Sequence, residues 1–258
     1  MENQTLAFAE RTLRDHLALL PKGWGRNFEI AIGLSGGGDY SYCVRDGKAR
    51  FTGSTPGNVL LGVYDYLRAI GFVFLYPGKG GTYVPDLRKP EGLEAEKKAF
   101  TASYAHRGIC IEGADSLEET LDFIDWLPKN GFNAFFLQFQ KPDIFFERWY
   151  LHTYNPSLPP EALTRQQLDG LDRQVEEAMA LRGIRCHRVG HGWTAQALGF
   201  PGTGWHKTDR EPEQKDLVAL VNGQRRFWKG IPANTNLCYA NPVARKRLVD
   251  QVVRYAKE

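Results

Sequence analysis

The sequence predicts a mixed α/β protein in which a small α+β layer precedes a series of parallel βα units. Three observations predict this class. Residues 1–98 combine two amphipathic helical segments with short strand-like runs and the Asp46-Gly47 signal of a tight hairpin. Residues 104–140 read as one complete βαβ unit. From residue 105 onward the predicted elements alternate as β-α-β-α-β-α.

The predicted α+β layer begins with an amphipathic helix over residues 5–20, which Pro21 ends. A strand follows over residues 28–34, and a glycine-rich loop, residues 35–39, then leads into the hairpin. These glycines lack the spacing of a P-loop or of a dinucleotide-binding fingerprint. The loop therefore argues against phosphate binding.

A second helix is predicted over residues 58–70, and Gly71 ends it before a strand over residues 72–76. The polar segment at residues 86–98 closes the layer, so we place a domain boundary there. The predicted domains are residues 1–98 and 99–258.

The βαβ unit opens with a buried strand over residues 107–111. Ser116 is a good N-cap for the helix that follows, because Glu119 stands at capping-box spacing. The second strand, residues 134–139, carries the polar Gln138 near its carboxyl end. Parallel α/β folds build their sites at that end of the sheet.

The rest of the chain continues the alternation. It comprises an aromatic loop over residues 143–160, a helix over 164–181, a strand over 184–189, an excursion rich in Gly, Trp and Asn over 190–239, and a last helix over 243–255. Three strands make either a small open sheet or the first part of a (β/α)8 barrel, which needs ~250 residues. Long insertions after strand carboxyl ends favour the incomplete barrel.

Composition excludes several classes of function. The formal net charge of +3, from 33 basic and 30 acidic residues, does not suit a nucleic-acid binder. No apolar run reaches the roughly 18 residues of a membrane span, and residues 1–20 are too charged for a secretory signal. We therefore expect a soluble protein of unassigned location that needs no cofactor. The cysteines are widely spaced and predicted to be reduced core thiols; they are Cys43, Cys110, Cys186 and Cys238.

The predicted third strand ends in a run that contains His187 and His191. With Cys186 nearby, the two histidines could bind a metal, but no carboxylate stands at a ligand-like spacing. We therefore predict no metal site, although a metal-dependent hydrolase remains an alternative. His191 either orients a hydroxyl or a catalytic carboxylate at the mouth of the barrel or holds its own loop in place.

Aromatic side chains concentrate in the long loops, among them Trp193 and Tyr239. Sugar rings stack on such side chains, and neighbouring amides such as Asn236 read hydroxyl groups. The same aromatics could instead form a core for the loops. Arg107 has two interpretations as well, a structural ion pair or a fork aimed at a ligand.

Several motifs resemble a known architecture. Residues 60–67, 70–72 and 76–78 resemble the small α+β domain that precedes the barrel in family 20 β-N-acetylhexosaminidases and in related α-glucuronidases. Residues 106–109, 130–133 and 190–192 resemble the start of the hexosaminidase barrel. A bacterial family of glycoside-hydrolase-like proteins with the same two parts shares the runs at residues 191–194 and 236–239.

The resemblance implies that Arg107 holds sugar hydroxyls and that His191 lines the same subsite. The hexosaminidase run that is rich in histidine and acidic residues is replaced here by residues 135–140, so the sugar is left open. The catalytic Asp-Glu pair of hexosaminidases follows the fourth strand. We therefore expect residues 1–258 to contain no catalytic residue. The expected substrate-binding residues are Arg107, His191, Trp193, Gln138, Asn236 and Tyr239.

The predicted function is thus that of the amino-terminal portion of a glycoside-hydrolase-like protein, with a carbohydrate as ligand. A carbohydrate-binding or scaffold module without catalysis is the alternative. Uncovered sheet edges and apolar faces predict self-association if the chain is this short.

Overall fold

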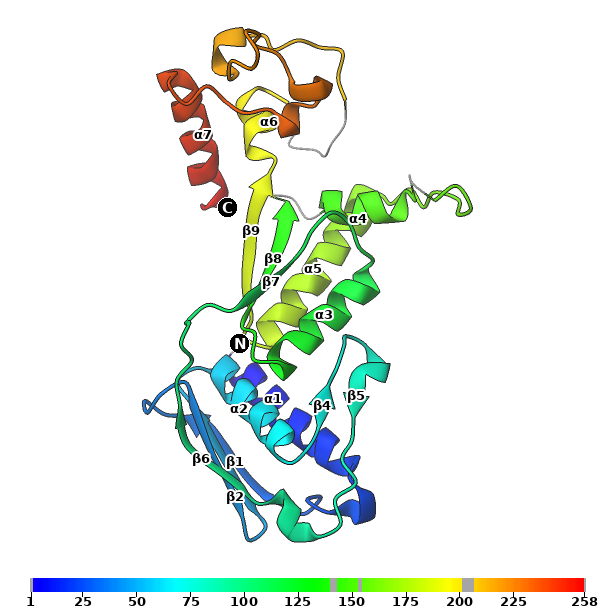
Figure 1. Ribbon diagram of the computed structural model, residues 1–258, viewed down its shortest axis with the longest axis vertical. Helices are drawn as coiled ribbons and strands as arrows, with labels where there is room; N and C mark the ends of the chain where they lie inside the picture. Colours follow the sequence, from blue (N-terminus) through cyan, green and yellow to red (C-terminus); the bar gives the residue numbers. More distant parts are fainter. Residues whose placement is uncertain (1, 140–142, 153–154, 201–206, 258) are drawn as a thin grey trace. The chain divides into compact units, whose positions relative to one another are not determined.

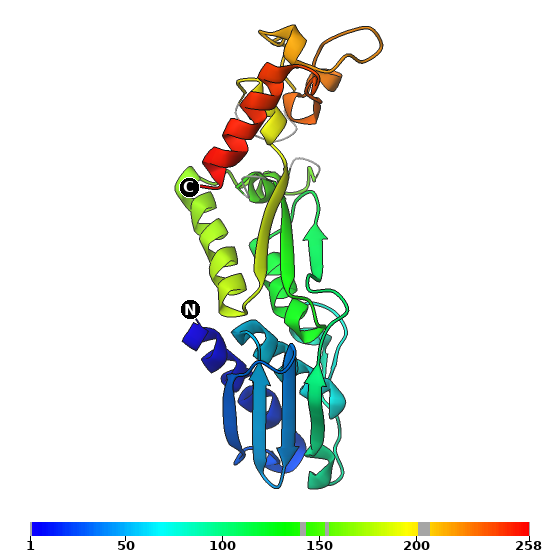
Figure 2. The ribbon, with the colours of Figure 1, turned by 90° about the vertical axis from the view of Figure 1, so that its left-hand side faces the viewer.

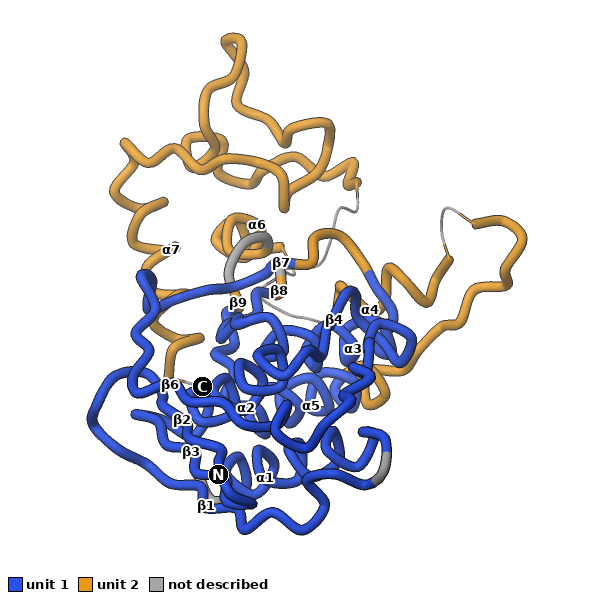
Figure 3. The backbone as a smooth tube through the Cα atoms, turned by 60° about the horizontal axis from the view of Figure 1, so that its bottom comes forward, with its two compact units in different colours: residues 1–110, 115–136, 169–187 blue, residues 111–114, 137–168, 188–258 orange. Residues whose placement is uncertain are grey.

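The computed structural model describes residues 2–139, 143–152, 155–200 and 207–257. Figure 3 shows that the chain divides into two compact units, each made of several segments. Unit 1 comprises Met1–Cys110, Asp115–Phe136 and Asp169–His187, and unit 2 comprises Ile111–Ala114, Leu137–Leu168 and Arg188–Glu258. The predicted boundary after residue 98 stays a prediction.

The amino-terminal layer of unit 1 is a four-stranded sheet with two helices on one face (Figures 1 and 2). Its strands are β1 (Glu29–Leu34), β2 (Tyr40–Arg45), β3 (Lys48–Gly53) and β6 (Ala95–Phe100), in the order β1-β3-β2-β6. Strands β1 and β3 are parallel, whereas β2 is antiparallel to β3 and to β6. The helices are α1 (Glu2–Ala18) and α2 (Pro56–Ala69). Both predicted helices and the hairpin are confirmed, but β6 was not predicted.

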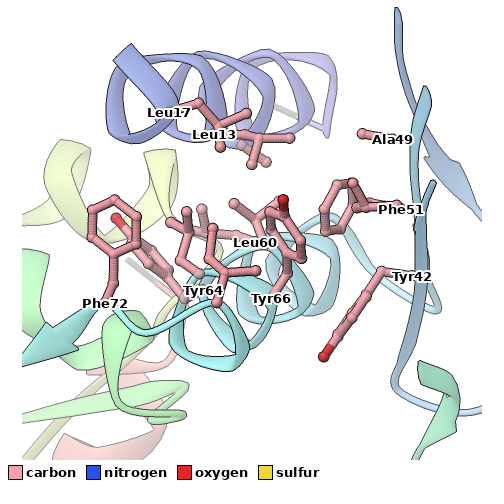
Figure 4. Close-up of a cluster of buried hydrophobic side chains, with 14 of the residues drawn as sticks. Leu13, Leu17, Tyr42, Ala49, Phe51, Leu60, Tyr64, Tyr66 and Phe72 are labelled. Carbon is pink, nitrogen blue, oxygen red and sulfur yellow. The ribbon is translucent and has the colours of Figure 1, made fainter. Parts of the chain in front are cut away.

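Figure 4 shows the core between these helices and the sheet. Leu60 and Tyr66 of α2 and Phe51 of β3 are fully buried there, and the Tyr66 hydroxyl donates to the Leu93 carbonyl at 2.9 Å. Helix α2 begins where the Thr55 hydroxyl accepts from the Asn58 amide. The layer therefore has a continuous hydrophobic core and a capped central helix.

Short elements complete this layer. They are the hairpin of β4 (Val73–Phe74) and β5 (Thr82–Tyr83) and the 3₁₀ turns η1 (Pro21–Gly23), η2 (Lys79–Gly81) and η3 (Pro90–Leu93). The strand predicted over residues 72–76 is thus shorter than expected.

A second, three-stranded sheet follows in the order β7-β8-β9. Its strands are β7 (Gly108–Ile111), β8 (Ala134–Phe139) and β9 (Arg185–His191), and α3 (Leu117–Lys129) and α5 (Arg165–Leu181) lie on one side of it (Figures 1 and 2). The strands start side by side, because the Ala134 amide donates to the Arg107 carbonyl and the Arg185 amide to the Asn133 carbonyl. The Ser116 hydroxyl caps α3 at 3.0 Å from the Glu119 amide. These predicted elements are confirmed.

A charged cluster joins the start of this sheet to the first layer within unit 1. The Arg182 guanidinium donates twice to Asp125 of α3, at 2.7 and 3.2 Å, and lies 4.8 Å from the centre of the Phe8 ring of α1. Burial raises the pKa of the Asp125 carboxyl, but Lys129 and Arg182 outweigh that effect, and the pKa lies below its ordinary value. Asp125 is therefore ionised. It binds Arg182, which in turn packs on Phe8 of α1.

Unit 2 is dominated by short helices and turns. They are α4 (Asp143–Tyr150), α6 (Trp193–Ala197), η4 (Lys215–Leu217), η5 (Trp228–Gly230), η6 (Pro232–Asn234) and α7 (Pro242–Tyr255). The prediction of an aromatic loop at residues 143–160 is wrong for its first half, because Ile144, Phe145 and Phe146 are buried along α4. The prediction for α7 is confirmed, since the Asn241 side chain accepts from the amides of Val243 and Ala244.

Two predictions about the surface have different outcomes. None of the four cysteines is in a disulfide, but Cys43, Cys110 and Cys186 are exposed and Cys238 is half-buried, so the prediction of core thiols is wrong. In the described part of the chain, no helix has the length and apolar character needed to cross a membrane.

Candidate functional site

A cavity of about 870 Å³ lies within unit 2, between the segments at residues 208–222 and 226–236. We call it the loop cleft. Trp228 gives it an aromatic wall, Asn234 and Asn236 supply amides, and Asp209, Arg226 and Lys229 supply charges. A wide cleft with one aromatic surface and several polar groups suits a polar ligand that has flat faces.

A small hydrophobic cluster lies next to the cleft and shares Phe227 with its lining. Leu217, Val218 and Leu237 are buried in it, and an antiparallel bridge joins Val218 to Leu237. Phe227 is buried and meets the Phe200 ring edge to face, with 4.9 Å between centroids. The side chain next in sequence, Trp228, is not part of this cluster and is 46% exposed.

The buried Thr235 fixes the backbone around Trp228. Its hydroxyl accepts from the Trp228 amide at 2.9 Å and donates to the Ile231 carbonyl at 2.7 Å. The Thr208 amide also donates to the Gly230 carbonyl at 2.8 Å, which ties the two walls of the cleft together. Trp228 is thus an exposed ring on a braced turn, and little ordering is needed when a ligand binds.

Lys229 adopts a strained backbone conformation in the same turn, with φ 51° and ψ 25°. This left-handed region is unfavourable for a residue other than glycine or asparagine. Such strain is commonly retained where a side chain is needed.

A perturbed thiol lies beside the cleft. A hydrogen bond from Arg225 is the main reason that the pKa of the Cys238 thiol lies below its ordinary value. Arg225 also donates to the Val218 carbonyl. Its guanidinium therefore stabilises the loops and is not available as a cation for a ligand.

Among the predicted substrate-binding residues whose side chains the structure describes, only Asn236 lines the loop cleft. Its carbonyl accepts from the Ala219 amide at 2.9 Å, which leaves the exposed side chain at the cleft. Trp193 begins α6 and meets Tyr255 edge to face at 5.2 Å, which supports the alternative of a core for the loops. Tyr239 is exposed outside the cleft. Gln138 and His191 stand near the ends of β8 and β9, and their side chains lie outside the described residues.

Arg107 lies at the amino end of β7 in unit 1, where it lines a smaller cavity of about 450 Å³. Its guanidinium donates to the Gly131 carbonyl at 2.7 Å and to the Tyr104 carbonyl at 2.5 Å. Barrel enzymes use the carboxyl ends of their strands. These contacts support a structural role, and the contact of Arg107 with a sugar stays a prediction.

The histidines form a pair that was not predicted. His106 and His187 place their Nε2 atoms 2.5 Å apart, so one ring donates to the other. Two ligands do not complete a zinc site, and the described residues contain no group of three or more His, Cys, Asp or Glu side chains arranged to hold a metal.

Two features were missed in the sequence. Asp115 follows β7 in unit 1, outside the loop cleft, and burial raises the pKa of its carboxyl. Arg226 and Lys229 flank Phe227 and Trp228, a pattern of cations around aromatics that is visible in the sequence. This pattern could have been found by looking for cations that flank aromatic residues in a predicted loop.

The fold is similar to that of solved glycoside hydrolases. The family 89 glycoside hydrolase from Clostridium perfringens matches the whole chain at 15% identity with a TM-score of 0.54, and the match covers 31% of that enzyme. The Streptomyces plicatus N-acetyl-β-hexosaminidase matches 97% of the chain at 14% identity and 0.52, and the Streptomyces coelicolor family 20 enzyme 98% at 16% and 0.51. The match covers 51% of each of these two enzymes.

These likenesses show that the chain has a hexosaminidase-like glycoside hydrolase fold, which confirms the resemblance seen in the sequence. The chain spans between about a third and a half of the length of these enzymes. No family model and no curated protein sequence matches it.

Proposed function

We propose that this chain is the amino-terminal portion of a glycoside-hydrolase-like protein, that it binds carbohydrate, and that the loop cleft holds the saccharide. The observation that carries the proposal is the likeness over almost the whole chain to family 89 and family 20 enzymes. Two of those structures are complexes with 2-acetamido-1,2-dideoxynojirimycin and with Thio-NAglucal, which are sugar-derived ligands.

The chemistry of the cleft supports this proposal. The exposed Trp228 ring offers a face on which the C–H groups of a pyranose stack. Asn234 and Asn236 each provide one acceptor and two donor hydrogens, which suit vicinal hydroxyls. In this proposal the full-length parent hydrolyses O-glycosidic bonds with carboxylates that follow a fourth strand, and the (β/α)8 barrel is completed by further βα units.

The test is saccharide binding by residues 1–258. Tryptophan fluorescence and calorimetry measure it, with N-acetylhexosamine oligosaccharides as probes. We expect binding without hydrolysis, and we expect Trp228→Ala to weaken it roughly tenfold or more because the stacking surface is lost. Trp149→Ala is the matched control, since Trp149 is 41% exposed on α4 and lies outside the cleft.

The outcomes separate the two candidate functions. Hydrolysis of aryl glycosides by residues 1–258 would contradict the expectation that this part of the protein is catalytically inactive. If the full-length protein binds saccharides through Trp228 but never hydrolyses them, the alternative of a binding or scaffold module is correct. Equal losses in the Trp228 and Trp149 variants would remove the cleft from the proposal.

A further inference from the structure

The charged residues of the loop cleft do not balance one another. Arg210 pairs with Glu213 at 3.3 Å and stacks on Phe200, and Glu211 pairs with Lys215. The remaining charged side chains of its lining are Arg226, Lys229 and Asp209. None of these three has an ion-pair partner among the described residues, and the adjacent residues 201–206 contain no carboxylate in their sequence.

The two uncompensated cations line the same cleft as one exposed ring. Arg226 and Lys229 are both exposed, and the Lys229 Nζ lies 5.9 Å from the centre of the Trp228 ring. The buried Thr235 braces this turn, and Phe227 anchors it in the hydrophobic cluster. A ligand that stacks on Trp228 therefore lies in a cleft that both cations line.

An anionic group on the sugar matches this arrangement. A guanidinium forms two parallel hydrogen bonds with a carboxylate or a sulfate, and an ammonium adds a point charge. Asp209 can accept hydrogen bonds from the hydroxyls of the same sugar, but it repels an anion and so limits where that group can lie. We infer that the loop cleft takes a saccharide that carries an anionic substituent, either a uronate carboxylate or a sulfate ester. This inference rests on the proposed carbohydrate function.

Matched pairs of oligosaccharides test it by calorimetry on residues 1–258. The first pair is a hyaluronan hexasaccharide and its carboxyl-reduced form, which differ only in the uronate charge. The second is a keratan sulfate hexasaccharide and its desulfated form, which have no uronate. We expect at least one anionic member to bind about tenfold more tightly than its neutral partner, because one charge-assisted contact has about that value.

Variants locate the contact. We expect Arg226→Gln to remove most of that preference, and Lys229→Asn to reduce it, since asparagine tolerates the left-handed backbone and lacks the ammonium. Arg254→Gln is the control, because Arg254 is an exposed cation of α7 outside the cleft. In all cases the preference should weaken as salt is raised.

The possible failures are distinguishable. If neutral and anionic members bind equally and Trp228→Ala abolishes both, the anionic inference is overturned and the carbohydrate function stands. If no member binds, both are overturned. Equal losses in the Arg226 and Arg254 variants would reveal a general charge effect and would also overturn the inference.

Discussion

The amino-terminal layer and the loop cleft region are stabilised in different ways. In the layer, hydrophobic residues at regular helix and strand spacing meet in one core, with Phe51, Leu60 and Tyr66 fully buried. In the loop cleft region a few side chains, above all Phe227 and Thr235, hold long irregular segments. Regular packing leaves no exposed functional group in the core, whereas the loops leave Trp228 and two cations free to meet a ligand.

The largest expected effect tests this difference directly. Phe51→Ala should lower the free energy of unfolding by about 3–5 kcal/mol, since a fully buried ring is removed from a continuous core. Phe227→Ala should affect mainly the loops, because its cluster is small. Calorimetric unfolding and saccharide binding of both variants are the measurements.

We expect Phe51→Ala to lower the temperature of the main unfolding transition with little effect on saccharide affinity at low temperature. We expect Phe227→Ala to weaken saccharide binding with little effect on the main transition. Equal shifts of the main transition in the two variants would contradict the contrast between the regions.

The charged cluster within unit 1 gives a smaller effect. Arg182→Gln should cost roughly 2 kcal/mol, between the values for buried and exposed pairs, because the Asp125 side chain is 35% exposed. Arg14→Gln is the control, since its pair with Glu10 is a more exposed contact within one helix and should contribute less than about 0.5 kcal/mol.

The measurements are chemical denaturation and NMR titration of the Asp125 carboxyl, whose pKa should rise in Arg182→Gln. An equal loss of stability in both variants would mean that the cluster does not join the two layers.

The sequence predicted the parts of the fold that have local signals. Ser116 and Asn241 form the caps that their neighbours indicated, and the Asp46-Gly47 turn joins β2 to β3. Strand β6 was missed because it is polar and pairs only with β2, as an edge strand does. Helix α4 was missed because residues 143–160 are rich in aromatic residues and proline, which suit a loop, whereas the burial of Ile144, Phe145 and Phe146 stabilises a helix in the first part of this segment.

The candidate site was less accessible from the sequence. Asn236 was predicted from a polar loop and lines the cleft, but nothing local indicates that residues 208–212 lie across from residues 226–236. That pairing depends on long-range bonds such as the one from Thr208 to Gly230. Arg107 illustrates the converse, since a residue type suited to ligands is engaged by two backbone carbonyls.

A partly buried histidine predicts how the layer responds to pH. His16 bonds to the Thr12 carbonyl through Nδ1 and packs edge to face against Tyr64, Phe72 and Phe74. Burial lowers the pKa of His16 below the ordinary histidine value of about 6.5. As the pH falls below 6.5, the unfolded state therefore takes up the proton first.

Stability should consequently be full above the unfolded pKa and be lost as the pH falls toward the folded one, by up to about 1.4 kcal/mol per pH unit. Denaturant midpoints between about pH 7 and pH 5 measure this slope. His16→Gln should have a flatter profile. An unchanged slope would show that the neutral imidazole is not the cause.

The smallest expected change in stability concerns the strained turn of the loop cleft. Replacing Lys229, at φ 51°, by glycine relieves the left-handed strain but adds freedom to the unfolded chain. These effects oppose each other, so we expect the free energy of unfolding to change by less than about 1 kcal/mol. Binding of the anionic oligosaccharide should nevertheless weaken, because the ammonium is lost. If the glycine variant keeps full affinity, the Lys229 charge is not needed, and the strain serves the shape of the turn around Trp228. A loss of affinity equal to that of Lys229→Asn assigns the effect to the charge.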